Sequence, residues 1–156
     1  AKTQLGIPIE QASLLAAVHG FAQVIGVLTL LPLSDYLGRK KTIIIMNSFI
    51  AASLFGIVLS GNSWGMLCFL VGLFAVFYGP TFPIYGACAG DYFPRSVMGT
   101  VIGAWTPFYG IGAIMSHWVT GLLRDSTGVY TIAFLTNGVM ALAGLVLILF
   151  VQKKPS

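Results

Sequence analysis

Five runs of about 20 or more predominantly apolar residues follow one another along the chain. They cover approximately residues 12–33, 42–61, 65–89, 97–122 and 129–151. A helix needs about 20 such residues to cross the hydrocarbon core of a bilayer, so each run is long enough for one crossing. The short connections leave no room for a soluble domain. The sequence therefore predicts an all-α fold: a polytopic membrane helix bundle in which residues 1–156 form one transmembrane domain of five transmembrane helices.

Composition supports this class, because 57% of the 156 residues are hydrophobic and only 8% are charged. Soluble domains carry about 25% charged residues. The net charge of +4 is accounted for by basic residues beside the apolar runs, where they contact anionic lipid. We therefore expect the lipid bilayer, and no nucleic acid, as a partner. Cys68 and Cys88 both lie in the third run and are interpreted as packing residues, not as a disulfide or metal site.

The positions of Lys and Arg in the short connections predict the orientation of the chain. One side of the membrane receives Arg39, Lys40, Lys41, Arg95, Lys153 and Lys154. The other side receives only Lys2 and Arg124. Since cytoplasmic loops carry the excess of basic residues, the sequence predicts that the amino terminus lies outside and the carboxy terminus in the cytoplasm.

Four of the twelve charged residues lie within ten positions, in the segment LSDYLGRKKT from Leu33 to Thr42. We expect a tight turn between two antiparallel helices here, with Gly38 permitting the backbone geometry. Arg39 would then pair with a nearby carboxylate. Asp91 is the candidate, because it ends the third run on the same side. The alternative is that the basic residues only fix the topology.

Polar side chains inside the spans are the candidates for substrate binding, because each costs free energy in the membrane unless it is paired or hydrated. These candidates are His19, Gln23, Tyr78, Tyr85, Trp105 and Tyr109. His19 and Gln23 are four residues apart and so share one helix face. Each candidate also has a structural interpretation, such as a histidine that hydrogen-bonds a neighbouring carbonyl. His117 lies nearer the outer end of its run and is a weaker candidate.

Glycine and proline predict where helices bend and pack. Pro80 and Pro83 lie mid-span in the third run, and each lacks a backbone donor, so this helix should bend. Gly86 with Gly90, and Gly99 with Gly103, form pairs of small residues that permit close contact between helices.

The segment LPLSDYLGRKK resembles the loop signature of the major facilitator superfamily, G-x-x-x-D-[RK]-x-G-[RK]-[RK]. Asp35, Gly38, Arg39 and Lys40 match the signature, whereas Leu31 and Tyr36 depart from it. The segments GDYFPRSVMGT and GLLRDSTGVYTIAFL resemble later loops of the same family. The resemblance identifies the five spans with helices eight to twelve of a twelve-helix transporter, that is, five helices of its carboxy-terminal six-helix half.

This resemblance implies that the chain is a fragment and that the amino-terminal half of the transporter is its missing partner. Residues 1–11 would then link it to a seventh helix. The alternative is a native five-helix protein that needs a partner chain. The family's cavity is lined in this half by helices seven, eight, ten and eleven, so the first, third and fourth runs are expected at its wall. Asn47 and Asn137, on the two peripheral runs, are weaker candidates. The resemblance also implies that loop residues on the cytoplasmic side form a gate, made of Asp35, Gly38, Arg39, Asp91 and Arg95.

The function implied is secondary active transport of a small solute by alternating access. We expect no enzymatic activity, no metal and no cofactor, because no acidic residue or nucleophile cluster lies within a span. An imidazole can take up and release a proton, so His19, if it lies in a pocket, would suit a coupling proton or an anion. FYGPTFPIYGACAGDYFPRSVMGT is similar to bacterial transporters of monocarboxylates, which favours a small organic anion as the substrate. A sugar or drug transporter, and a non-transporting receptor or structural subunit, remain open. The family resemblance implies the plasma membrane.

Overall fold

The computed structural model describes residues 8–61 and 63–151. Its helices are α1 (Ile9–Leu37), α2 (Arg39–Leu59), α3 (Trp64–Tyr78), α4 (Thr81–Tyr92), α5 (Met98–Thr127) and α6 (Thr131–Phe150), with a short 3₁₀ helix η1 (Arg95–Val97) before α5. Within those residues no strand forms. Five segments are long and apolar enough to cross a membrane, with α3 and α4 counted as one and η1 and α5 as another. The all-α membrane bundle is therefore confirmed.

The connection between the first two spans is much shorter than the expected loop. Helix α1 continues to Leu37, so Asp35 lies on its last turn, and Arg39 is already the first residue of α2. Gly38 alone separates the two helices, with a φ of +89°, a value that costs little only for glycine. At the other end of α1, residues 9–11 are helical and not part of a link. Residues 1–7 lie outside the described part of the chain.

The third span is broken, not merely bent. Helix α3 ends at Tyr78 and α4 begins at Thr81, with Gly79 and Pro80 between them. Pro80 has no N–H to continue the helical ladder, and the Thr81 hydroxyl donates to the Tyr78 carbonyl at 2.6 Å. Consequently Tyr78 and Tyr85, both from the third run, lie on two different helices.

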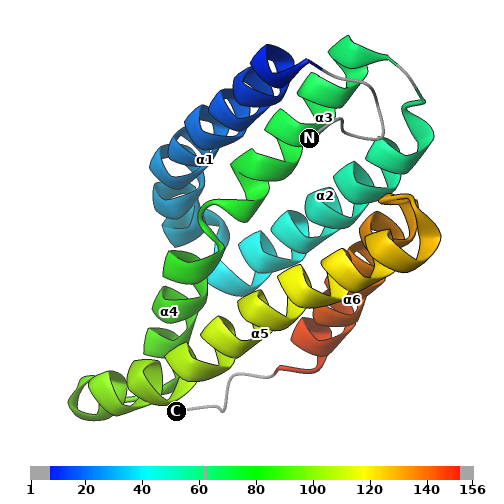
Figure 1. The fold of residues 1–156 in the computed structure, drawn as a ribbon. Helices are drawn as coiled ribbons and strands as arrows, with labels where there is room; N and C mark the ends of the chain where they lie inside the picture. The colour runs from blue at the N-terminus through cyan, green and yellow to red at the C-terminus, as the bar shows by residue number, and fades with distance from the viewer. Residues whose placement is uncertain (1–7, 62, 152–156) are drawn as a thin grey trace.

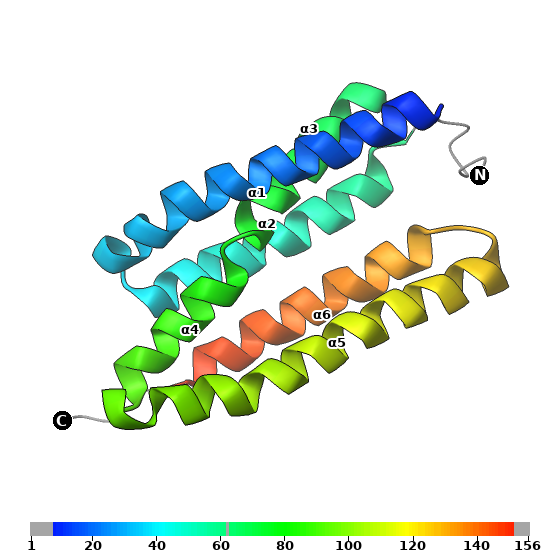
Figure 2. The ribbon, with the colours of Figure 1, turned by 60° about the vertical axis from the view of Figure 1, so that its left-hand side comes forward.

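The helices run roughly alongside one another, as Figures 1 and 2 show. Helix α1 packs along α3, and α2 contacts α1, α3, α4 and α6. Helix α5 lies beside α6 and meets α4 near its start. The α1–α2 junction, η1 and the end of α6 gather at one end of the bundle, and the α2–α3 and α5–α6 turns lie at the other (Figure 1).

The core of the bundle forms around the first half of α2. Ile43 and Met46 are almost completely buried and pack with Ile84 and Cys88 of α4 and with Ile148 of α6. This cluster ties together three helices that are far apart in the sequence. It lies toward the end of the bundle where the charged residues gather.

The closest helix contact joins α1 to the broken third span. A Cβ atom on Gly26 would lie 1.9 Å from the carbonyl oxygen of Val76, and one on Gly79 would lie 2.8 Å from the carbonyl oxygen of Gln23. Only glycine leaves room for these backbones to approach so closely. The Val76 carbonyl is also the one that Pro80 cannot bond, so the break and the close contact occur together.

The glycine pairs expected to form close contacts do not form them in the structure. An added Cβ on Gly86, Gly99 or Gly103 would meet nothing within 4 Å among the described residues. On Gly90 it would meet only the end of the Met98 side chain, at 3.9 Å. Spacing alone does not say which face of a helix meets a neighbour, and these glycines face away from the other described helices.

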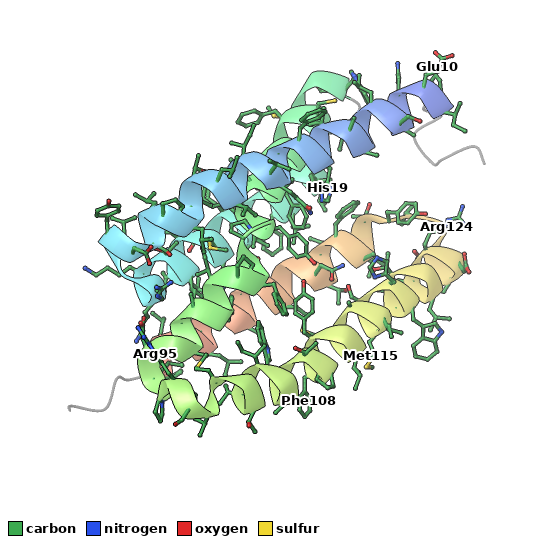
Figure 3. The ribbon with its side chains drawn as sticks, turned by 90° about the vertical axis from the view of Figure 1, so that its left-hand side faces the viewer. Glu10, His19, Arg95, Phe108, Met115 and Arg124 are labelled. Carbon is green, nitrogen blue, oxygen red and sulfur yellow. The ribbon has the colours of Figure 1, made fainter. Side chains whose placement is uncertain are left out.

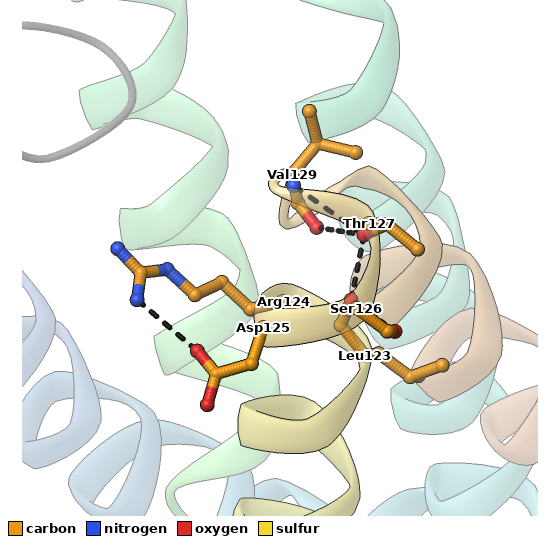
Figure 4. Close-up of polar contacts among 6 residues, drawn as sticks. All are labelled: Leu123, Arg124, Asp125, Ser126, Thr127 and Val129. Carbon is orange, nitrogen blue, oxygen red and sulfur yellow. Dashed lines mark hydrogen bonds and ion pairs between the residues drawn. The ribbon is translucent and has the colours of Figure 1, made fainter.

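Side-chain hydrogen bonds close the turn between α5 and α6 (Figure 4). The Thr127 hydroxyl donates to the Leu123 carbonyl at 2.6 Å and accepts from the Val129 N–H at 3.3 Å. Arg124 pairs with Asp125 at 3.2 Å. The Thr127 hydroxyl thus gives the Val129 N–H, just beyond the end of α5, a hydrogen-bond partner.

Candidate functional site

The charged cluster, defined as Asp35, Arg39 and Asp91, joins three helices at one end of the bundle. Arg39 lies 2.8 Å from Asp35 and 3.3 Å from Asp91 through two different guanidinium nitrogens. Its side chain is 25% exposed, whereas the two carboxylates are 58% and 43% exposed. Gly38 sets this geometry by starting α2 immediately after α1. Such partly exposed ion pairs are individually weak, so this contact can form and break at modest cost.

Arg95 does not join this cluster. It lies on η1, beyond the end of α4, and forms no ion pair with any described residue. Figure 3 shows it at the same end of the bundle. The structure therefore brings together three of the four charged residues assigned to the gate and leaves the fourth apart.

Lys40 has a separate partner. Its ammonium group donates to the carbonyls of Leu149 and Val151 at 3.0 and 2.6 Å, at the carboxyl end of α6. A cation in this position satisfies unpaired carbonyls and interacts favourably with the helix dipole. From the sequence, Lys40 contributes only to the topology and the family motif, because no local signal connects residues 109 positions apart.

His19 and Gln23 lie side by side on α1, with their side-chain nitrogens 3.4 Å apart. Both are half-buried. In Figure 3 His19 extends from α1 toward the other helices, and its ring stacks against Phe74 of α3 at 6.1 Å. The pair thus forms a polar patch that faces the bundle.

An aromatic cluster lies between α3, α4 and α5. We define it as Phe74, Tyr78, Phe82, Tyr85, Trp105 and Tyr109. Phe82 stacks on Trp105 with ring centres 4.9 Å apart and meets Tyr109 edge-on at 5.2 Å. The Tyr85 ring stacks on the Trp105 ring, with ring centres 6.3 Å apart. These offset-stacked and edge-to-face arrangements are the favourable ones for aromatic rings.

The aromatic cluster continues to the polar patch. Phe74 stacks on Tyr78 at 5.2 Å, and the phenol groups of Tyr78 and Tyr109 interact with each other. A connected row of rings therefore leads from His19 on α1 to Trp105 on α5. All six candidates from the sequence belong to this one row or to the polar patch at its end.

Asn47 holds one member of the row in place. Its side-chain amide donates to the Tyr85 hydroxyl at 2.9 Å, between α2 and α4. From the sequence, Asn47 is a weaker candidate, because its helix is expected at the periphery. In the structure Asn47 is buried, and it satisfies the hydroxyl of a predicted site residue. Tyr85 is thus more constrained than its neighbours.

Two aromatic residues were not among the binding residues chosen from the sequence. Phe74 and Phe82 complete the row, yet phenylalanine carries no polar atom to distinguish it from ordinary lipid-facing residues. Phe82 lies one position after Thr81, at the start of α4. Its spacing from Tyr78 and Tyr85, and the proline-containing segment YGPTFP, are the signals that draw attention to it.

An open hollow of about 270 Å³ lies beside the polar patch, lined by Gly20, Gln23, Val24, Val27, Leu28 and Gly79. It borders the break between α3 and α4 and not the aromatic cluster itself. Gln23 belongs both to the lining of this hollow and to the polar patch.

The two weaker candidates, His117 and Asn137, also have hydrogen-bond partners. His117 donates through Nδ1 to the Ala113 carbonyl at 2.7 Å, one turn earlier in α5. Asn137 accepts from the Ser116 hydroxyl at 3.2 Å. Among the described residues no group of three or more His, Cys, Asp or Glu side chains could hold a metal ion.

Comparison with protein families gave one match. The family model described as Major Facilitator Superfamily matches residues 1–156, which is the whole length of the chain. Comparison with curated proteins gave no match, and comparison with solved structures gave none.

Proposed function

Because the chain belongs to the Major Facilitator Superfamily and is an integral membrane protein of a transporter family, we propose that it carries out secondary active transport by alternating access. The observation that carries this proposal is the position of Arg39, which bridges Asp35 on α1 and Asp91 on α4. An ion-pair contact of this kind holds helix ends together in one state and releases them in the other.

The break in the third span supports the same mechanism. Helix α4 carries Phe82 and Tyr85 at one end and Asp91 at the other. It is separated from α3 by Gly79 and Pro80, where the helical ladder is interrupted. We propose that a shift of α4 at this break couples the aromatic cluster to the charged cluster. Arg95 has no place in this contact and is assigned a topological role.

We propose a small organic anion, such as a monocarboxylate, as the substrate, and a proton as the coupling ion. His19 supports both, because a protonated imidazole pairs with a carboxylate and an imidazole exchanges protons near neutral pH. Among the described residues, the side chains of Gln23 and Phe74 contact His19, and neither is charged.

The remaining features of the proposal concern placement. We propose the plasma membrane, with the end that carries Arg39 and Arg95 in the cytoplasm, in agreement with the rule for basic residues. We also propose that an amino-terminal half, on the same chain or a separate one, completes the cavity. The exposure of Tyr78 and Tyr109 supports this, since these rings then line a shared space.

The test is uptake by the complete transporter in proteoliposomes with an imposed proton gradient. A panel of small carboxylates and sugars would be compared in the wild type, in His19→Ala and in the matched control His117→Ala. We expect carboxylate uptake that the gradient drives and that His19→Ala abolishes. His117→Ala should retain it, since His117 already bonds the carbonyl of its own helix.

Loss of uptake in both variants would contradict the specific role of His19. Flux of sugars alone would contradict the anion proposal. The absence of flux for every solute, with folded protein, would contradict transport and favour a receptor or structural subunit on the same fold.

A further inference from the structure

The proposed substrate site has an aromatic end and a polar end. At the aromatic end the Phe82 and Trp105 rings are nearly parallel, at 14°, and Tyr109 stands edge-on to Phe82 at 69°. At the polar end His19 and Gln23 present an imidazole and an amide. A solute that fits both ends needs a flat apolar part and a hydrogen-bonding part.

The rings of the aromatic cluster keep free surface. Tyr78, Phe82 and Tyr109 are each between 37% and 39% exposed. A cluster that served packing alone would cover its rings with neighbouring side chains, as happens for Ile43 and Met46 in the core. Uncovered faces and edges of stacked rings are suited to a further ring.

Charge does not contribute within this region. Every described Asp, Glu, Lys and Arg residue lies in the first or last turn of a helix or on η1, away from the middle of the spans. Binding in this half therefore depends on stacking and on hydrogen bonds from neutral groups or His19. Sites of this composition recognise a ligand by its apolar shape and orient it by a few polar contacts.

We propose that the site takes a planar, ring-bearing organic acid whose ring stacks on Phe82, Trp105 and Tyr109 and whose polar group faces His19 and Gln23. This inference rests on the proposed transport function and narrows its substrate to acids with a flat ring. A short acid without a ring would leave the aromatic end uncovered.

The test compares three acids in proteoliposomes of the complete transporter: benzoate, cyclohexanecarboxylate and lactate. The first two have the same number of carbon atoms and the same charge, but only benzoate is flat. The variants are Phe82→Leu and its matched control Phe108→Leu. Phe108 lies on α5 and is 74% exposed, and it points away from the other helices (Figure 3).

We expect transport to prefer benzoate over the other two acids. Phe82→Leu should raise the KM for benzoate about 2- to 12-fold, the range expected for loss of one aromatic pair, while Phe108→Leu leaves it unchanged. Trp105→Phe, which keeps a ring, should retain more of the preference than Trp105→Leu. Equal transport of benzoate and cyclohexanecarboxylate, or equal effects of the two Phe→Leu variants, would overturn the inference.

Calorimetric binding of benzoate to the purified transporter separates this inference from the proposed function. Binding that Phe82→Leu weakens, without flux of any acid, would overturn transport and leave the ring site standing. Lactate flux with no preference for benzoate would overturn the ring site and leave transport standing. Absence of both binding and flux would overturn both.

Discussion

Helices α2 and α5 both belong to segments apolar enough to span a membrane, but their surroundings are opposite. Eight residues of α2 are buried, whereas none of α5 is, although the structure describes every residue of both. Helix α2 contacts four other α-helices and α5 contacts two. The difference separates two tasks. Helix α2 holds the bundle together, and α5 leaves its side chains uncovered, toward the space that we propose an amino-terminal half completes.

The two faces of α5 are also distinct. Trp105 and Tyr109 pack against Phe82 on one side. Phe108 and Met115 point away from the bundle on the other (Figure 3). Changes on α2 should therefore alter stability, and changes on the Trp105 face of α5 should alter transport. Similar substitutions on the two helices, or beside them, should therefore separate effects on stability from effects on transport.

The largest effect is expected from the core. Ile43→Ala on α2 should lower the free energy of unfolding by about 2–5 kcal/mol, because Ile43 is fully buried and its removal leaves a cavity. Ile114→Ala on α5, where the side chain is 72% exposed, is the matched control and should change it little. Chemical unfolding in detergent micelles measures both, and equal losses would contradict the division.

The next largest effect concerns the close contact of α1 with α3. Gly26→Ala would place a Cβ atom 1.9 Å from the Val76 carbonyl oxygen, so backbone must move, at a cost of about 1–3 kcal/mol. Gly103→Ala on α5 meets nothing within 4 Å among the described residues and should gain up to about 1 kcal/mol from helix propensity. Melting temperatures should move in opposite directions, and a shared direction would be inconsistent with this contact.

A smaller effect is expected where α2 meets the aromatic cluster. Tyr85→Phe removes the acceptor for the Asn47 amide and should cost about 0.5–1.5 kcal/mol. Tyr36→Phe at the end of α1 is the control, because its side chain is 88% exposed and the hydrogen bond to α2 from Asn47 involves only Tyr85. Unfolding in detergent separates them, and a destabilisation by Tyr36→Phe as large as that by Tyr85→Phe would contradict the role of the contact with α2.

The smallest effect is at the end of α6. Lys40→Met removes the cation that caps the carbonyls of Leu149 and Val151, at a cost of about 0.3–1 kcal/mol. Lys41→Met, at an exposed position beside it, should cost less. Hydrogen exchange of the last turn of α6 reports the difference directly, and unchanged protection in Lys40→Met would rule out the cap.

The sequence was sufficient for the fold class and the number of spans, because long apolar runs determine both. It offered Asp91 as a partner for Arg39 but left open a purely topological role for the basic residues, and the structure shows the contact. The extent to which each helix is buried in the bundle was harder to predict. A helix in a membrane is apolar on every side, so periodicity does not show that α2 is central and α5 peripheral to the packing.

Contacts between distant positions explain the other differences. Lys40 meets carbonyls more than one hundred residues later, and Asn47 meets Tyr85 across two helices. Phe82 joins the aromatic cluster from α4, just after the break at Gly79 and Pro80. Glycine spacing predicted close contacts at Gly99 and Gly103, whereas the contacts occur at Gly26, which faces the Val76 carbonyl, and at Gly79, which faces the Gln23 carbonyl.

The most direct test is to measure transport and stability together in two variants of the complete transporter, Tyr109→Leu and Ile43→Ala. Carboxylate uptake in proteoliposomes and melting temperature in detergent would be recorded for each. We predict that Tyr109→Leu loses most uptake with its melting temperature nearly unchanged, and that Ile43→Ala melts earlier but transports while it remains folded. Full uptake by Tyr109→Leu would contradict the assignment of α5 to the transport path.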